Sequence, residues 1–234
     1  MRFAFISDIH GNYFALKAVL DYLSEDVESP IDRIICLGDI LAGHGGNEKV
    51  IDLLDQYQVE LIQGNHDARF IPWDIVPDNR MDLMKAIAKW EDEQIPLDIR
   101  DRLDALPRTL SIPLEDGRML FAFHSNPDNL WDMANASDVG SRKMFQVYGD
   151  LPGDVLVYGH YHRNHVLQVD GKTLINVGSV SGRVNMYPDD LARFTTIESR
   201  PDRLVIRQEV ASYDVAAQLA MDQKANAPFA RNWD

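Results

Sequence analysis

The chain has 234 residues, of which 45% are hydrophobic and 26% charged, a composition typical of a globular protein with one sizeable core. The formal net charge of −14 argues against binding of long nucleic acid, which needs rows of Lys and Arg against the phosphates. No signal peptide is visible, no apolar run approaches the roughly 20 residues that span a bilayer, and one cysteine excludes an internal disulfide, so we expect a cytoplasmic enzyme without a membrane partner.

The first part of the chain alternates predicted strands and helices. We expect strands over 2–7, 32–37 and 59–63, and helices over 12–24 and 47–56. In the first helix apolar residues recur at helical spacing, and they are Leu16, Val19, Leu20 and Leu23. Asn12 is its expected N-cap, and Cys36 is expected to pack inside the second strand. This βαβαβ order predicts a parallel sheet with right-handed crossovers.

Residues 68–108 differ from their surroundings, because they are rich in charge and helix formers and are interrupted by prolines. We interpret them as a helical insertion beside the functional site, with helices over 81–93 and 97–106. The aromatic residues of the insertion allow two interpretations, and they are Phe70, Trp73 and Trp90. They stack on a nucleobase or, as is more common for such residues, pack the insertion onto the main domain.

The second half of the chain is predicted to be rich in strands. The expected strands are 109–114 and 118–123 as a hairpin, 155–159, and then a meander of 165–169, 172–177, 193–198 and 203–210. Helices are expected over 138–148 and 214–224. Val215, Leu219 and Met221 of the last helix would cap a sheet or meet a partner, and the sequence leaves the oligomeric state open. We therefore predict an α/β fold with two sheets and one domain over 1–234, ending in a helix and tail over 211–234.

Five polar blocks follow predicted strands at the points where the strands end. The blocks are Asp8-Ile9-His10, Gly38-Asp39, Asn65-His66-Asp67, His124 and Gly159-His160-Tyr161-His162. Side chains at the carboxyl ends of neighbouring strands converge in open α/β sheets. Two carboxylates, an asparagine and several imidazoles in one place predict a metal site, and the number of ligands indicates two metals. A metal pair needs a bridging carboxylate, for which Asp39 is the candidate. Nitrogen and oxygen ligands suit Mn, Fe, Zn or Ni, and manganese is the choice for assays.

Taken singly, these residues have ordinary structural explanations. Asp8 and Asp39 alone would be turn residues or N-caps, and His124 alone would be a core histidine. Only their combination favours metal binding. His44 and His165 belong to no block and are expected at the surface. The segment before the second helix contains Gly43, Gly45 and Gly46. These glycines would form a flexible loop or, less simply, bring backbone amides to a phosphate.

The five blocks, in this order and at these spacings, resemble the five motifs of the calcineurin-like metallophosphoesterases. The segment from Ile175 to Val180 also resembles the Asn-Pro-Gly-Ser segment of the small bacterial phosphodiesterase branch of that superfamily. The resemblance covers roughly residues 2–210. It implies a four-layer α/β-β/α sandwich and hydrolysis of a phosphoester.

The resemblance also implies roles for individual residues. One metal would be held by Asp8, His10, Asp39 and His162, and the second by Asp39, Asn65, His124 and His160. A hydroxide that bridges the metals would attack phosphorus. His66 would contact the phosphate or protonate the leaving oxygen, and Asp67 would hydrogen-bond His66 and raise its pKa.

The chain departs from its relatives at positions that do not remove a ligand. Phosphoprotein phosphatases extend the second motif as Gly-Asp-x-x-Asp-Arg-Gly, but residues 38–44 lack that second acid and the arginine. Tyr161 replaces the usual threonine of the last motif, where it would narrow the pocket, stack on a base or face the core. His124 is followed by Ser125-Asn126-Pro127, near the usual His-Gly-x-Pro.

We therefore expect a dinuclear-metal-dependent phosphoesterase that hydrolyses a small phosphodiester or nucleotide-like substrate. The alternatives are a phosphomonoesterase that acts on dinucleoside polyphosphates or phosphoproteins, and a metal-binding scaffold without catalysis. Scaffold relatives such as the retromer subunit tend to lose ligands or the catalytic histidine, whereas this chain keeps them. Arg69 and Arg183 flank the motifs and would bind substrate phosphate or pair with acidic residues.

Overall fold

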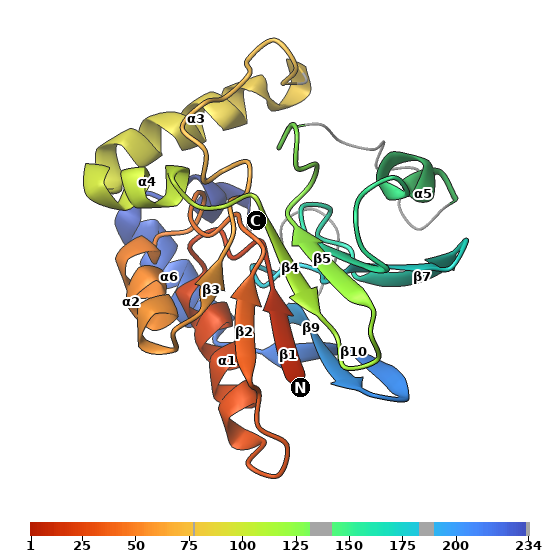
Figure 1. The fold of residues 1–234 in the computed structure, drawn as a ribbon. Helices are drawn as coiled ribbons and strands as arrows, with labels where there is room; N and C mark the ends of the chain where they lie inside the picture. Colours follow the sequence, from red (N-terminus) through yellow and green to blue (C-terminus); the bar gives the residue numbers. More distant parts are fainter. Residues whose placement is uncertain (77, 132–141, 183–189, 233–234) are drawn as a thin grey trace.

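Two five-stranded sheets packed face to face form the centre of the computed structural model, with helices on both outer sides (Figure 1). The structure describes residues 1–76, 78–131, 142–182 and 190–232. Its four layers are the α/β-β/α sandwich that the sequence resemblance implies. None of the helices within these described ranges combines the length and the apolar character needed to cross a membrane.

The first sheet has the strand order β10-β9-β1-β2-β3. Its strands are β1 (Arg2–Ile6), β2 (Arg33–Cys36), β3 (Glu60–Leu61), β9 (Leu191–Arg200) and β10 (Arg203–Ser212). The first three run parallel and are connected by α1 (Tyr13–Glu25) and α2 (Asn47–Gln56), so the predicted βαβαβ unit is confirmed. Asn12 caps α1 as expected, because its side-chain oxygen accepts a hydrogen bond from the Ala15 amide at 3.0 Å.

The second sheet has the order β4-β5-β6-β8-β7. Its strands are β4 (Thr109–Pro113), β5 (Met119–Phe123), β6 (Val155–Tyr158), β7 (His165–Val169) and β8 (Lys172–Asn176). The predicted hairpin of β4 and β5 is confirmed, and β6 runs parallel to both β5 and β8.

The expected meander of the last four strands is wrong. β7 and β8 pair with each other in the second sheet, whereas β9 crosses to the first sheet and pairs with β1. The pairing of β9 covers the edge of β1 that β2 leaves open, and a buried central strand cannot leave its backbone amides and carbonyls unpaired.

The two inner sheet faces share one apolar cluster, and each outer face buries another against helices. Between the sheets, Phe3 and Phe5 of β1 pack against Leu120 and Val157 of the second sheet. The outer face of the first sheet packs on α1, whose apolar stripe is buried as expected, and Cys36 is buried there as well. The outer face of the second sheet packs on α5 (Arg142–Tyr148). Residues 138–141 of the helix predicted there lie outside the described residues.

The helical insertion consists of α3 (Asp78–Gln94) and α4 (Leu97–Asp104) and stands above one end of the sandwich (Figure 1). The chain closes with α6 (Val215–Ala225) and a 3-10 helix, η2 (Pro228–Asn232), against which α3 packs. Trp90 fixes this contact, because its indole N–H donates to the Ala225 carbonyl at 3.0 Å. The packing interpretation is therefore confirmed for Trp90, whereas Phe70 and Trp73 remain partly or largely exposed.

Candidate metal centre

The polar blocks that follow the strands meet between the carboxyl ends of the two sheets. The structure gathers two groups of ligand atoms, Asp8, His10 and His162 in the first and Asp39, His124 and His160 in the second. Within each group the candidate ligand atoms lie within 4.8 Å of one another. Asn65 joins the second group, because its Oδ1 lies 3.1 Å from Nε2 of His124.

Asp39 lies between the two groups. Its Oδ2 is 3.8 Å from Nε2 of His10 in the first group and 3.3 Å from Nε2 of His124 in the second. One carboxylate oxygen thus faces an imidazole of each group, which is the position that a bridging ligand between two cations would occupy.

The hydrogen bonds behind the imidazoles fit metal binding. Nδ1 of His10 lies 3.1 Å from the Ala42 carbonyl, and Nδ1 of His124 lies 2.8 Å from the Leu37 carbonyl. A carbonyl oxygen only accepts, so Nδ1 of each ring donates and Nε2 faces the other ligand atoms. Nε2 of His10 consequently lies 3.2 Å from Nε2 of His162. Imidazole lone pairs that point at one another are stabilised by a cation between them. This set of nitrogen and oxygen donors suits a divalent transition metal.

The buried carboxylates of the candidate metal centre favour positive charge beside them. Burial raises the pKa of Asp8, but the neighbouring His162 outweighs burial and holds the pKa at about 2. Burial lowers the pKa of His124, yet the negative charge of Asp39 raises it to about 9. For His160, burial and the charge of His124 outweigh the effect of Asp39 and Asp8 and lower its pKa to about 3. A cluster that holds buried carboxylates ionised and a buried imidazole protonated is one in which a cation is stabilised.

The backbone of the centre is bent into an unusual conformation. Five of the ligand residues have φ angles between 50° and 66°, and they are Asp8, His10, Asp39, His160 and His162. This left-handed region is uncommon for residues other than glycine, although Asp, Asn and His enter it more readily than others. Gly38 and Gly64 allow the loops to touch, since a Cβ on Gly38 would lie 2.3 Å from the Gly64 amide nitrogen. Strain of this kind is maintained at functional sites.

The end of β8 and the segment after it support the backbone of the ligand loops. Ser179 Oγ donates to the Asp8 carbonyl at 3.0 Å, and the Asn176 side chain donates to the Gly159 carbonyl at 2.5 Å. The sequence resemblance pointed to this segment without giving it a role. Its polar side chains fix the backbone of one ligand residue and of the glycine that precedes His160.

Asp67 does not have the role expected from the sequence. Its Oδ2 accepts hydrogen bonds from the backbone amides of Asp39 and Gly64, both at 2.8 Å, and its Oδ1 accepts from Ile40 at 3.0 Å. The prediction that Asp67 hydrogen-bonds His66 and raises its pKa is wrong, since these amides take the carboxylate and burial lowers the pKa of His66. Asp67 holds the backbone of Asp39 instead. The His66 amide donates to Oδ1 of Asp39 at 2.8 Å.

The prediction that both histidines outside the motifs lie at the surface is wrong for His44. His44 is only 2% exposed, and its Nδ1 lies 2.7 Å from Oδ2 of Asp222 in α6. His165 is half-buried, with Nε2 2.7 Å from the hydroxyl of Tyr158. Local sequence gave no sign of these contacts, because both partners lie on other elements.

The glycine-rich loop before α2 packs against the C-terminal helices. A Cβ on Gly43 would lie 2.3 Å from the Phe229 ring, and one on Gly45 would lie 2.7 Å from Cβ of Ala225. Gly46 would meet the Tyr13 side chain in the same way. The glycines are therefore required for close packing of this loop against the helices.

The contacts of Tyr161 and Arg69 distinguish between the alternatives that the sequence left open for them. Tyr161 is 5% exposed and its hydroxyl lies 3.0 Å from that of Tyr148, so it faces the core and does not narrow a pocket. Arg69 pairs with Asp101 at 2.6 Å, which favours the ion-pair interpretation. Arg183 lies outside the described residues.

A four-layer sandwich with buried histidines and aspartates gathered between the carboxyl ends of its sheets defines a metal-binding α/β protein. The family model of the calcineurin-like phosphoesterase superfamily domain matches residues 1–199, and the chain belongs to that superfamily. It is also similar to the uncharacterized protein MJ0912 of Methanocaldococcus jannaschii, with 29% identity over 188 residues that cover 76% of this chain and 69% of the relative.

Solved structures of similar proteins share the fold. A metallophosphoesterase from Sphaerobacter thermophilus aligns with a TM-score of 0.70 and 22% identity over 97% of this chain and 95% of its own. The hypothetical protein PH1004 from Pyrococcus horikoshii OT3 aligns with a TM-score of 0.75 and 19% identity over 97% of this chain and 94% of its own. The similarity extends over both sheets and the insertion.

Proposed function

We propose that this protein is a dinuclear-metal-dependent phosphoesterase that hydrolyses a small phosphodiester or nucleotide-like substrate. The observation that carries the proposal is the placement of Asp39 Oδ2 between two groups of ligand atoms that together include all the ligands expected from the sequence. Two divalent ions held there would acidify water and neutralise charge on the phosphate oxygens.

His66 is the candidate for direct contact with the reacting phosphate. Its ring lies 5.3 Å from the ring of His10 and 5.8 Å from that of Trp131, and it belongs to neither ligand group. Burial lowers the pKa of His66, so the ring is neutral before substrate binds and has one N–H to donate. A bound phosphate anion beside it would favour the protonated form, from which the leaving oxygen would take its proton.

The loop after Asp39 supports a diester over a phosphoprotein. In phosphoprotein phosphatases the motif places an acid and an arginine where this chain has Ala42 and Gly43. Both positions serve packing and orientation here, since the Ala42 carbonyl accepts from His10 and Gly43 touches Phe229. A diester carries less negative charge than a monoester and has less need of an arginine.

Initial rates of hydrolysis test the proposal. Chelator-stripped protein with Mn²⁺ added back should cleave bis(p-nitrophenyl) phosphate faster than p-nitrophenyl phosphate. Asp39→Ala should reduce turnover to background while the far-UV circular dichroism spectrum is unchanged, and the exposed Asp202→Ala should keep full activity. Full activity of the Asp39 variant would contradict the two-metal site, and a preference for the monoester would replace the diesterase assignment with a phosphomonoesterase.

A further inference from the structure

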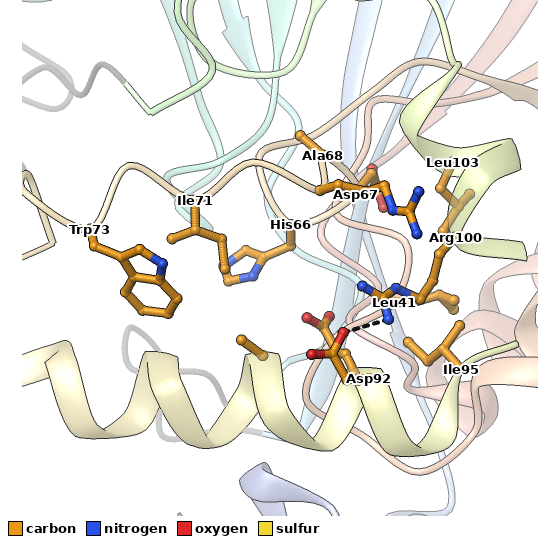
Figure 2. Close-up of a pocket in the computed structure, with 13 residues that line it drawn as sticks. Leu41, His66, Asp67, Ala68, Ile71, Trp73, Asp92, Ile95, Arg100 and Leu103 are labelled. Atoms are coloured by element: carbon orange, nitrogen blue, oxygen red, sulfur yellow. Dashed lines mark ion pairs between the residues drawn. The ribbon is translucent and has the colours of Figure 1, made fainter. Parts of the chain in front are cut away.

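A pocket of about 250 Å³ lies between His66 and the helical insertion. Figure 2 shows the His66 side chain in the middle of this space, with Trp73 on one side, Arg100 on the other, and the helix that carries Asp92 along its base. The pocket shares His66 with the metal centre. A substrate whose phosphate lies at the metal centre would therefore have the pocket next to it for its organic part.

The two arginines of the pocket pair with acidic residues in it or beside it. Arg100 contacts Asp92 at 2.5 Å, and Arg69 contacts Asp101 at 2.6 Å. Because each of these arginines is paired with an acid, the two pairs carry no net positive charge that would attract a second phosphate. The pocket is therefore suited to an uncharged group.

Glu91 is the exception among these charged groups, because no hydrogen bond or ion pair joins its carboxyl to another described side chain. It lines the pocket from α3, and His66 lines the same pocket. The groups whose charges act on it are Arg100, which favours its ionised form, and three acids that oppose it, Asp39, Asp67 and Asp92. Burial, with these acids, raises the pKa of Glu91 to about 8. A neutral carboxyl offers one donor and one acceptor side by side.

The remaining lining is apolar and limits the size of the ligand. Ile71 and Trp73 lie in the segment after His66, and Ala88 and Ile95 also line the pocket. The volume falls just below the roughly 300–1,000 Å³ of pockets that hold drug-sized ligands, so it suits a single ring system and not a protein segment. A flat, uncharged ring with adjacent hydrogen-bonding atoms matches both the lining and the carboxyl.

We propose that this pocket binds the nucleobase of a nucleoside phosphoester, with the Glu91 carboxyl hydrogen-bonded to the base edge and Trp73 covering its apolar face. The inference rests on the proposed phosphoesterase function and adds its substrate class. It assigns to the insertion the part of the substrate that the metal centre does not contact.

Two esters that release the same leaving group test the proposal with manganese-loaded protein. Thymidine 5′-(p-nitrophenyl phosphate) carries a base, whereas methyl p-nitrophenyl phosphate does not. The parent protein should have a kcat/KM at least tenfold higher on the nucleoside ester. Glu91→Ala should lower that value about tenfold, mainly through KM, and leave the methyl ester unaffected, while Glu91→Gln, whose amide also donates and accepts, should keep most of the preference.

Two further variants separate recognition from damage to the fold. Trp73→Ala, at a position that is 40% exposed, should also weaken only the nucleoside ester. Glu93→Ala removes an acid from the same helix outside the pocket and should change neither rate. Equal rates of the parent on both esters, or equal losses on both in Glu91→Ala and Trp73→Ala, would overturn the nucleobase pocket while leaving the phosphoesterase function in place.

A binding measurement covers the case in which the proposed function itself fails. If the parent cleaves neither ester, the phosphoesterase function is overturned, and calorimetric titration of the manganese-loaded protein with thymidine 5′-monophosphate and with inorganic phosphate decides the pocket separately. Tighter binding of the nucleotide that Glu91→Ala abolishes would support the pocket. Equal affinity for the two ligands would overturn it.

Discussion

At the scale of single residues, Glu91 shows what burial does to a carboxyl group that lacks an ion-pair partner. Its pKa rises from a model-peptide value of 4.5 to about 8 in the folded protein. Between these pH values the unfolded chain has released the proton that the folded chain still holds. The folded state then binds more protons, so raising the pH through this window lowers the free energy of unfolding.

Replacing Glu91 with Gln should remove this pH-dependent cost. We expect Glu91→Gln to be more stable than the parent by about 2 kcal/mol at pH 8, less than the full ~1.4 kcal/mol per pKa unit because the side chain keeps some solvent contact. The difference should shrink as the pH falls and disappear near pH 4.5. Urea denaturation of chelator-stripped protein between pH 5 and 8 measures it, with Glu93→Gln as the exposed control on the same helix. A difference that does not vary with pH would contradict the assignment.

At the scale of elements, the C-terminal helices hold the loop that orients a metal ligand. The Asp222 carboxylate contacts His44 and accepts from the Gly45 amide at 2.8 Å. One residue earlier in the loop, the Gly43 carbonyl accepts from the Phe229 amide at 3.1 Å. The carbonyl of Ala42, the residue before Gly43, accepts from His10. The helices α6 and η2, which follow the residues 1–199 matched by the family model, thus support the candidate metal centre.

Loss of the Asp222 carboxylate should be costly because it is fully buried and its partners would remain buried. We expect Asp222→Ala to reduce the free energy of unfolding by about 2–4 kcal/mol. Asp214→Ala removes the N-cap of the same helix, which accepts from the Ala217 amide at 2.9 Å, and should cost only about 1 kcal/mol. Chemical denaturation of both variants gives the comparison. Equal losses would mean that α6 is held by its cap and not by the loop.

The sequence was informative about elements and much less so about their pairing. The predicted ends of α2 and β7 match the observed ones. Local apolar spacing depends on which face of an element is buried, so it can be read from the sequence. The sheet to which β9 belongs was predicted wrongly, because any apolar strand satisfies the local pattern and only the open edge of β1 selects it.

The candidate site also contains residues that could be predicted from the sequence and residues that could not. The ligand residues could be predicted because they occupy motifs at strand ends, where the chain direction alone brings them together. The contacts of Asp67 with Asp39 and of His44 with Asp222 could not, since these partners are distant in sequence. The burial of Glu91 could not either, since it arises from tertiary packing. Glu91 did leave one signal, an acid in the stripe of Ala88 and Ile95 that lines the pocket, and such a position in a helix is normally apolar.

At the scale of the whole molecule, the metal centre joins the two sheets. In the first ligand group Asp8 follows β1 of the first sheet, whereas His162 follows β6 of the second. In the second group Asp39 follows β2, whereas His124 follows β5. A cation in either group would therefore bind both halves of the sandwich and should stabilise the fold as a unit.

Manganese should raise the unfolding temperature accordingly. At a hundredfold excess over the dissociation constant, binding adds about 2.7 kcal/mol, which corresponds to a rise of roughly 5–10 °C for a chain of this size. Differential scanning fluorimetry measures the shift, and a chelator should reverse it. Asp39→Ala should show a much smaller rise, and the same rise in that variant would argue against a shared ligand.

The pairing of β1 with β9 sets an order of events on the ribosome. Every candidate ligand has been synthesised by residue 162, yet β1 does not gain its second neighbour until residues 191–200 have emerged. The nascent chain thus carries all its metal-binding side chains before it has the sheet that holds them at fixed angles. Ions that arrive in that interval meet ligands without a fixed geometry, so discrimination among metals by geometry begins only when the last strands are in place.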